Sequence, residues 1–125
     1  MNQKKIFIVD DNEMFAQMLQ DHLSTLPKFS TALFSTGEEC LKHLHEGPDL
    51  IILDYHLNDV FKDAADGLAI LERIKKEQPG ITVIMLSSQG KYTVAAQTIS
   101  KGAVQYVVKD DNAFSNISRI LKDVF

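Results

Sequence analysis

The most informative segment of the chain is Asp49-Leu50-Ile51-Ile52-Leu53-Asp54, in which four apolar residues in a row end on a carboxylate. A short run that is apolar throughout is typical of a strand with helices on both faces of its sheet. Similar runs end on polar residues at three other places: Ile6–Val9 before Asp10 and Asp11, Ile81–Leu86 before Ser87 and Ser88, and Val104–Val108 before Lys109. Parallel strands joined by helical crossovers end at one edge, where open α/β sheets bind ligands. The sequence therefore predicts that carboxylates, a hydroxyl and a lysine converge at this edge.

Apolar strands alternate with helical segments along the chain. The spacing predicts strands at about 4–9, 29–34, 49–53, 81–86 and 103–108, and helices at about 13–25, 37–45, 67–78, 91–100 and 113–124. Alternating strands and helices with short connections are typical of an α/β fold with one doubly wound sheet. Thr36 and Glu39 have capping-box spacing, and Cys40 shares an apolar helical face with Leu41 and Leu44, which favours a core position. We expect five parallel strands flanked by five helices.

Composition places the chain among globular domains. Its 125 residues, 45% of them hydrophobic, suffice for one domain with a buried core. No apolar run approaches the roughly 18 residues of a transmembrane helix, and the N-terminus lacks a signal-peptide pattern. The single cysteine, Cys40, fits a reducing cytoplasm, and the net charge of −4 argues against nucleic acid binding. We expect residues 1–125 to form one cytoplasmic domain without membrane contact.

The charges at the predicted edge need compensation. Two carboxylates about 5 Å apart repel by about 3 kcal/mol at an effective dielectric of ~20, so Asp10, Asp11 and Asp54 require a proton or a cation. Mg²⁺ commonly binds one or two carboxylates with water and a phosphate oxygen. With Lys109 and Ser87, these residues suit phosphoryl transfer to the Asp54 carboxylate. Taken singly, each has a plainer interpretation: a helix N-cap for Asp10 or Asp11, a turn residue for Asp54 or Ser87, and a solvated charge for Lys109.

These residues, in this order and spacing, resemble the receiver domain of two-component response regulators. The resemblance extends from Lys4 to Phe125 and rests on four segments: Val9-Asp10-Asp11-Asn12, Leu53-Asp54, Leu86-Ser87-Ser88 and Lys101–Lys109. It implies a flavodoxin-like receiver fold and a role in phosphorelay signal transduction. Such a domain takes part in its own phosphorylation and dephosphorylation without being a conventional turnover enzyme.

The resemblance also implies a role for each residue of the site. Asp54 would accept a phosphoryl group from a phosphohistidine on a histidine kinase or a histidine phosphotransfer protein. Mg²⁺ would be held by four groups: Asp10, Asp11, Asp54 and the backbone carbonyl of His56. Lys109 would contact the phosphoryl group, Ser87 would move toward it, and Tyr106 would turn inward. The fourth helix, the fifth strand and the fifth helix would then present a different output surface.

The partners implied by the resemblance are proteins. The first helix has more apolar surface than a core face needs, at Met14, Phe15 and Met18, which favours docking of a kinase's helical bundle. The signal would pass to a downstream protein target or to an output domain outside this sequence. A dimer formed on phosphorylation would use the output surface, where Tyr92 and Ile99 offer apolar side chains.

The segment after Asp54 departs from the family pattern. Family members usually have Met-Pro here and then Asp-Gly at the start of the third helix, whereas residues 55–65 separate Asp54 from Asp66-Gly67. The longer loop would lie beside the site and alter the access of a partner or of water. His56 and Gln89 would flank the phosphoryl group and influence the lifetime of an aspartyl phosphate.

Three other functions fit parts of the pattern. An aspartyl-nucleophile phosphatase usually needs a second aspartate two residues after the nucleophile, and here that residue is His56. A flavin or dinucleotide site usually has a Gly-rich loop after the first strand, which this sequence lacks. A degenerate receiver that binds proteins without being phosphorylated is the main alternative, although the intact set of acidic and basic residues favours phosphorylation.

Overall fold

The structure, a computed structural model, describes residues 3–88 and 90–125 and contains one parallel sheet. The five strands are β1 (Lys4–Val9), β2 (Phe29–Phe34), β3 (Leu50–Asp54), β4 (Thr82–Ser87) and β5 (Gln105–Val108), in the spatial order β2-β1-β3-β4-β5. The helices are α1 (Glu13–Ser24), α2 (Gly37–Lys42), α3 (Gly67–Glu77), α4 (Tyr92–Ser100) and α5 (Ala113–Val124), with a 3-10 helix, η1, at Leu44–Glu46. The predicted doubly wound α/β fold is therefore confirmed.

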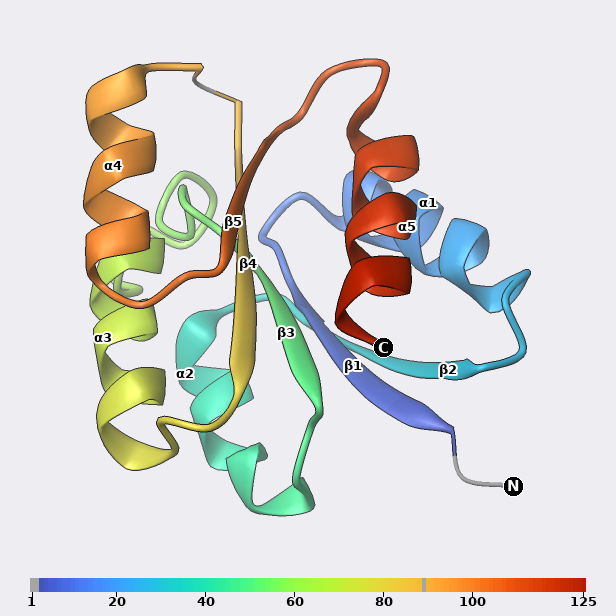
Figure 1. The fold of residues 1–125 in the computed structure, drawn as a ribbon. Helices are drawn as coiled ribbons and strands as arrows, with labels where there is room; N and C mark the ends of the chain where they lie inside the picture. The colour runs from blue at the N-terminus through green and yellow to red at the C-terminus, as the bar shows by residue number, and fades with distance from the viewer. Residues whose placement is uncertain (1–2, 89) are drawn as a thin grey trace.

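Helices cover both faces of the sheet. In Figure 1, α2, α3 and α4 lie on one side and α1 and α5 on the other. Successive side chains of a strand point to opposite faces, so β3 supplies Ile51 to the core under α2 and α3 and Ile52 to the core under α1 and α5. All five residues of β3 are buried, which explains its continuous apolar run. No helix in the described part of the chain has the length and apolarity to cross a membrane.

The strand order creates the crevice in which the site lies. β1 pairs with β2 on one side and with β3 on the other, so the crossovers leave the middle of the sheet in opposite directions and a crevice opens there. The register aligns the strand ends in pairs: Val9 with Leu53, Asp54 with Leu86, and Ser87 with Val108. Asp10 therefore follows beside Asp54, and Lys109 follows beside the end of β4.

The predicted boundaries agree with the observed ones to within two residues except in α2. The helix expected over 37–45 ends at Lys42, and the chain continues as the 3-10 helix η1. Gly47 closes this turn with a φ of +71°, a left-handed conformation that glycine adopts without a steric penalty. Thr36 caps α2 as expected, because its hydroxyl accepts the Glu39 N–H at 3.2 Å. Cys40 is fully buried, as predicted.

Candidate functional site

Three buried aspartates meet at the carboxyl end of the sheet. Asp10 and Asp11 follow β1 and Asp54 ends β3, with exposed fractions of 1%, 6% and 2%. One carboxylate oxygen of each lies within 4.8 Å of the other two. The N-cap of α1 is Asn12, whose side chain accepts the Phe15 N–H at 3.1 Å. The plainer interpretation of Asp10 or Asp11 as this helix's cap is therefore wrong, and one carboxylate oxygen of each lies close to Asp54 instead.

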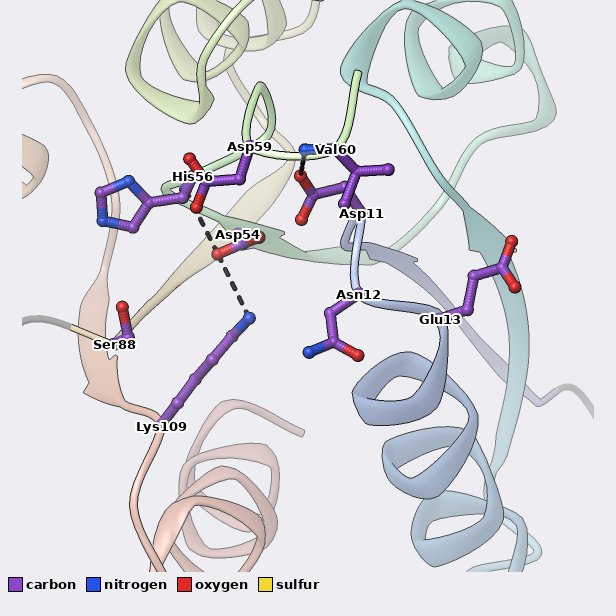
Figure 2. Close-up of a pocket in the computed structure, with 9 residues that line it drawn as sticks. All are labelled: Asp11, Asn12, Glu13, Asp54, His56, Asp59, Val60, Ser88 and Lys109. Atoms are coloured by element: carbon purple, nitrogen blue, oxygen red, sulfur yellow. Dashed lines mark hydrogen bonds and ion pairs between the residues drawn. The ribbon is translucent and has the colours of Figure 1, made fainter. Parts of the chain in front are cut away.

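Lys109 reaches from the end of β5 into the cluster of aspartates. Its Nζ lies 2.8 Å from Asp10 Oδ2 and 3.4 Å from Asp54 Oδ1, and its side chain is only 15% exposed. Nζ also lies 4.6 Å from the centroid of the Phe15 ring, a cation–π contact. Figure 2 shows the extended Lys109 side chain directed at Asp54. Lys109 is thus a largely buried counter-charge rather than a solvated one.

The pKa of Asp54 is strongly perturbed. Burial, and next the charge of Asp10, raise this pKa to about 8, while Lys109 and a hydrogen bond from the His56 N–H at 3.3 Å act in the opposite direction. One lysine cannot neutralise three carboxylates. Asp10 Oδ2 faces Lys109 as an ion pair but accepts no hydrogen bond, which is unusual for a buried oxygen. The site therefore favours an added cation.

The chemistry of the donor set fits Mg²⁺. Hard divalent cations prefer carboxylate oxygens, and Mg²⁺ usually retains several waters beside one or two carboxylates. Within residues 3–88 and 90–125, Asp10, Asp11 and Asp54 are the one group of acidic, histidine or cysteine side chains close enough to share a metal ion. The predicted meeting of these three carboxylates is therefore confirmed, and their composition and spacing suit a hard divalent cation.

A cavity of about 530 Å³ gives access to this cluster. Its lining includes residues from the strand ends, the start of α1 and the loop after β3: Asp11, Asn12, Glu13, Asp54, His56, Asp59, Val60, Ser88 and Lys109. Most of these residues have polar or charged side chains, and the charges are of both signs (Figure 2). A charged group the size of a phosphoryl can therefore approach Asp54 from solvent.

The two predicted switch residues lie beside the cavity rather than in its lining. Ser87 is fully buried at the end of β4, and its carbonyl accepts the Lys109 N–H at 2.8 Å. Tyr106, on β5, is half-buried and packs against the core cluster on the α2 and α3 side. Ser88, which follows Ser87, does line the cavity. Gln89, expected to flank the site, lies outside the described residues.

The long loop after β3 contributes a site residue that sequence reasoning missed. Val60 lines the cavity, and its backbone N–H donates to Asp11 Oδ2 at 3.0 Å (Figure 2). Any residue except proline supplies a backbone N–H, so side-chain identity carries no signal for this contact. His56, expected from the sequence, does line the cavity.

Comparison with known proteins agrees with this geometry. The response regulator receiver domain family matches residues 6–121. The response regulator protein VraR of Staphylococcus saprophyticus is 28% identical over 123 residues, which cover 97% of this chain and 56% of that protein. A protein-glutamate methylesterase/protein-glutamine glutaminase of Oceanobacillus iheyensis is 31% identical over 127 residues, covering 98% of this chain and 34% of that protein. The chain thus spans about half or less of the length of these relatives.

Solved structures show the same architecture. The receiver domain of NtrX from Brucella abortus superposes with a TM-score of 0.81 at 28% identity, covering 94% of this chain and 95% of that one. A CheY-like receiver domain protein from Methanospirillum hungatei reaches a TM-score of 0.83 at 23% identity, covering 98% and 94%. Sequence, fold and the arrangement of strand ends therefore agree: this chain belongs to the response regulator receiver domain family of two-component signalling.

Proposed function

We propose that Asp54 accepts a phosphoryl group from a phosphohistidine on a histidine kinase or a histidine phosphotransfer protein. The observation that carries the proposal is the position of Asp54, which is buried yet lines an open cavity beside Lys109 and two further aspartates. A carboxylate that only stabilised the fold would need neither an access route nor this excess of negative charge. The remaining steps follow from the neighbours of Asp54.

In the transfer step, an Asp54 carboxylate oxygen attacks phosphorus and the donor's histidine nitrogen leaves. Lys109 Nζ, 3.4 Å from Asp54 Oδ1, is placed to neutralise charge on the phosphoryl oxygens. Mg²⁺, bound by Asp10, Asp11, Asp54 and the His56 carbonyl, would supply the further positive charge that the phosphoryl oxygens and an ionised Asp54 require. The hydroxyl of Ser87 would donate a hydrogen bond to a phosphoryl oxygen after a short movement of β4's end.

Phosphorylation would then change the output surface. The phosphoryl group adds about −1.5 to −2 charge and three acceptor oxygens, which attract Lys109 away from Asp10 and draw Ser87 closer. The hydrogen bond between the Lys109 N–H and the Ser87 carbonyl couples the ends of β4 and β5. Movement at either end therefore reaches Tyr106 and the surface of α4, β5 and α5. The phosphoryl group changes the free-energy difference between the two conformers by the difference in its interaction free energy with each of them.

The proposed partners are proteins, and the proposed setting is the cytoplasm. Met14 and Met18 on α1 are 74% and 52% exposed, an apolar surface beside the cavity suited to a helical donor domain. Tyr92, 85% exposed on α4, is available on the opposite side for a downstream protein, an output domain or a second phosphorylated copy. With its net charge of −4, the domain would not contact nucleic acid directly. Residues 1–125 would act together as one receiver domain.

Intact-mass spectrometry after incubation with acetyl phosphate and Mg²⁺ tests the proposal. We expect a gain of one phosphoryl group that is absent with EDTA and absent in Asp54→Asn. A protein that binds Mg²⁺ but gains no mass, either with acetyl phosphate or with a panel of phosphorylated histidine kinases, would instead support the degenerate, unphosphorylated binding module.

A further inference from the structure

The loop between β3 and α3, residues 55–66, is held in place at several points. Leu57 is fully buried in the core under α2 and α3. Near the other end of the loop, the Ala65 N–H donates to Glu38 Oε2 of α2 at 2.9 Å. These contacts fix both arms of the loop against the body of the protein, so its tip has a defined position beside the cavity.

The tip of the loop contacts the acidic cluster through a backbone hydrogen bond. The Val60 N–H donates to Asp11 Oδ2 at 3.0 Å, joining segments 49 residues apart in the sequence (Figure 2). Val60 is 60% exposed, whereas Asp11 is 6% exposed. Burial of its side chain therefore contributes little to the position of Val60, and the interaction with the site is made by the peptide N–H.

We propose that the Val60 N–H positions Asp11 for Mg²⁺, an inference that rests on the metal binding proposed above. A hydrogen bond to Oδ2 fixes the rotation of the Asp11 carboxylate and leaves Oδ1 for the ion. It also stabilises the negative charge of Asp11 in a cluster where three carboxylates repel one another. Groups that orient metal ligands in this way commonly change metal affinity by about 10- to 100-fold.

The contact also couples the metal site to the loop. Opening of the loop removes the donor from Asp11 and weakens the site for Mg²⁺, so bound Mg²⁺ must favour the closed loop by the same factor. The extra length of this loop thereby acquires a function: it brings a backbone donor over the edge of the sheet. Val60 is a positioning residue in this account, because it acts through Asp11 and not on the phosphoryl group.

Comparison of Val60→Pro with Val60→Ala distinguishes the contribution of the backbone N–H from that of the side chain. Proline removes the donor, and alanine keeps it while truncating the exposed side chain. We expect isothermal titration with Mg²⁺ to show about tenfold weaker binding for Val60→Pro and unchanged binding for Val60→Ala. Thermal unfolding in EDTA should show a cooperative transition for both variants, with a lower midpoint only for Val60→Pro, because proline leaves the buried Asp11 carboxylate without this hydrogen bond.

Hydrogen–deuterium exchange of the metal-free protein gives a second test that needs neither Mg²⁺ nor proline. Asp11→Ala should speed exchange in peptides covering the loop tip, whereas Asp10→Ala, which removes a carboxylate that does not accept from the loop, should not. Wild-type affinity in Val60→Pro, or unchanged loop exchange in Asp11→Ala, would overturn the positioning role while leaving the magnesium site intact. Absence of Mg²⁺ binding by the wild-type protein would instead overturn the proposed function on which the inference rests.

Discussion

Replacing Asp54 by asparagine is expected to stabilise the metal-free protein at alkaline pH. Asp54 is 2% exposed, and burial followed by the charge of Asp10 raises its pKa to about 8. The folded protein therefore resists ionisation of this carboxyl group, which in an unfolded chain ionises near pH 3.8. Asparagine has nearly the same shape and no charge, so it removes this cost.

The size of the effect follows from the two pKa values. A difference of about four units, from 3.8 to about 8, corresponds to about 6 kcal/mol at 1.36 kcal/mol per unit. Because the folded-state pKa is the higher one, the proton on Asp54 stabilises the fold fully below about pH 3.8, and this stability is lost as the pH rises through about 8. The advantage of Asp54→Asn should thus grow by up to about 4 kcal/mol from about pH 5 to pH 8.

Urea unfolding in EDTA, followed by far-UV circular dichroism because the chain has no tryptophan, measures this difference. Wild type and Asp54→Asn are compared at several pH values, and Asp111→Asn, at an exposed aspartate, is the control. The wild type should lose stability relative to Asp54→Asn as the pH rises, and the control should track the wild type. The same difference in unfolding free energy at about pH 5 and pH 8 would refute the perturbed ionisation of Asp54.

Metal binding, phosphorylation, stability and thiol reactivity each offer a further test of the structure. Mg²⁺ should displace the Asp54 proton, so its affinity should rise by up to about tenfold per pH unit below about pH 8; titration calorimetry that shows no pH dependence would contradict this. Lys109→Met should slow phosphorylation by acetyl phosphate by about 100-fold while strengthening Mg²⁺ binding, because it removes a positive charge beside Asp10 and Asp54; an unchanged rate would contradict the role of Lys109. Gly67→Ala should destabilise the fold by about 1–3 kcal/mol or more in urea, because a Cβ at Gly67 would lie 2.2 Å from the Asp54 carbonyl oxygen; wild-type stability would contradict this. Cys40, buried and with a pKa raised by burial to about 12, should resist alkylation in the native protein and react in urea, so rapid native labelling would contradict its placement.

Most of the site was predictable because its residues lie directly at strand ends. Asp54 ends β3 and Lys109 follows β5, so the parallel arrangement alone brings them to one edge. Apolar runs and cap signals such as Thr36 placed nearly all elements to within two residues. These features depend on local sequence, which periodicity and capping rules describe.

Other features depend on contacts between distant segments. The strand order, in which β1 lies beside β3, could not be predicted from the sequence. The apolar pattern of each strand would be the same in any order. The cap of α1 is Asn12, although the preceding aspartates have equal capping propensity; their carboxylates instead face Lys109 and the loop. The Val60 N–H donates through the backbone, and no side-chain pattern identifies such a donor.

Locating the phosphoryl group within the chain shows directly whether Asp54 is the residue that accepts it. The protein is phosphorylated with acetyl phosphate and Mg²⁺, reduced with borohydride, which converts an aspartyl phosphate to homoserine, and mapped by peptide mass spectrometry. We expect homoserine in place of Asp54 and unmodified aspartate at Asp10 and Asp11. Conversion at Asp10 or Asp11 instead, or a phosphoryl group that resists reduction because it lies on a serine or histidine, would show that Asp54 is not the phosphoryl acceptor.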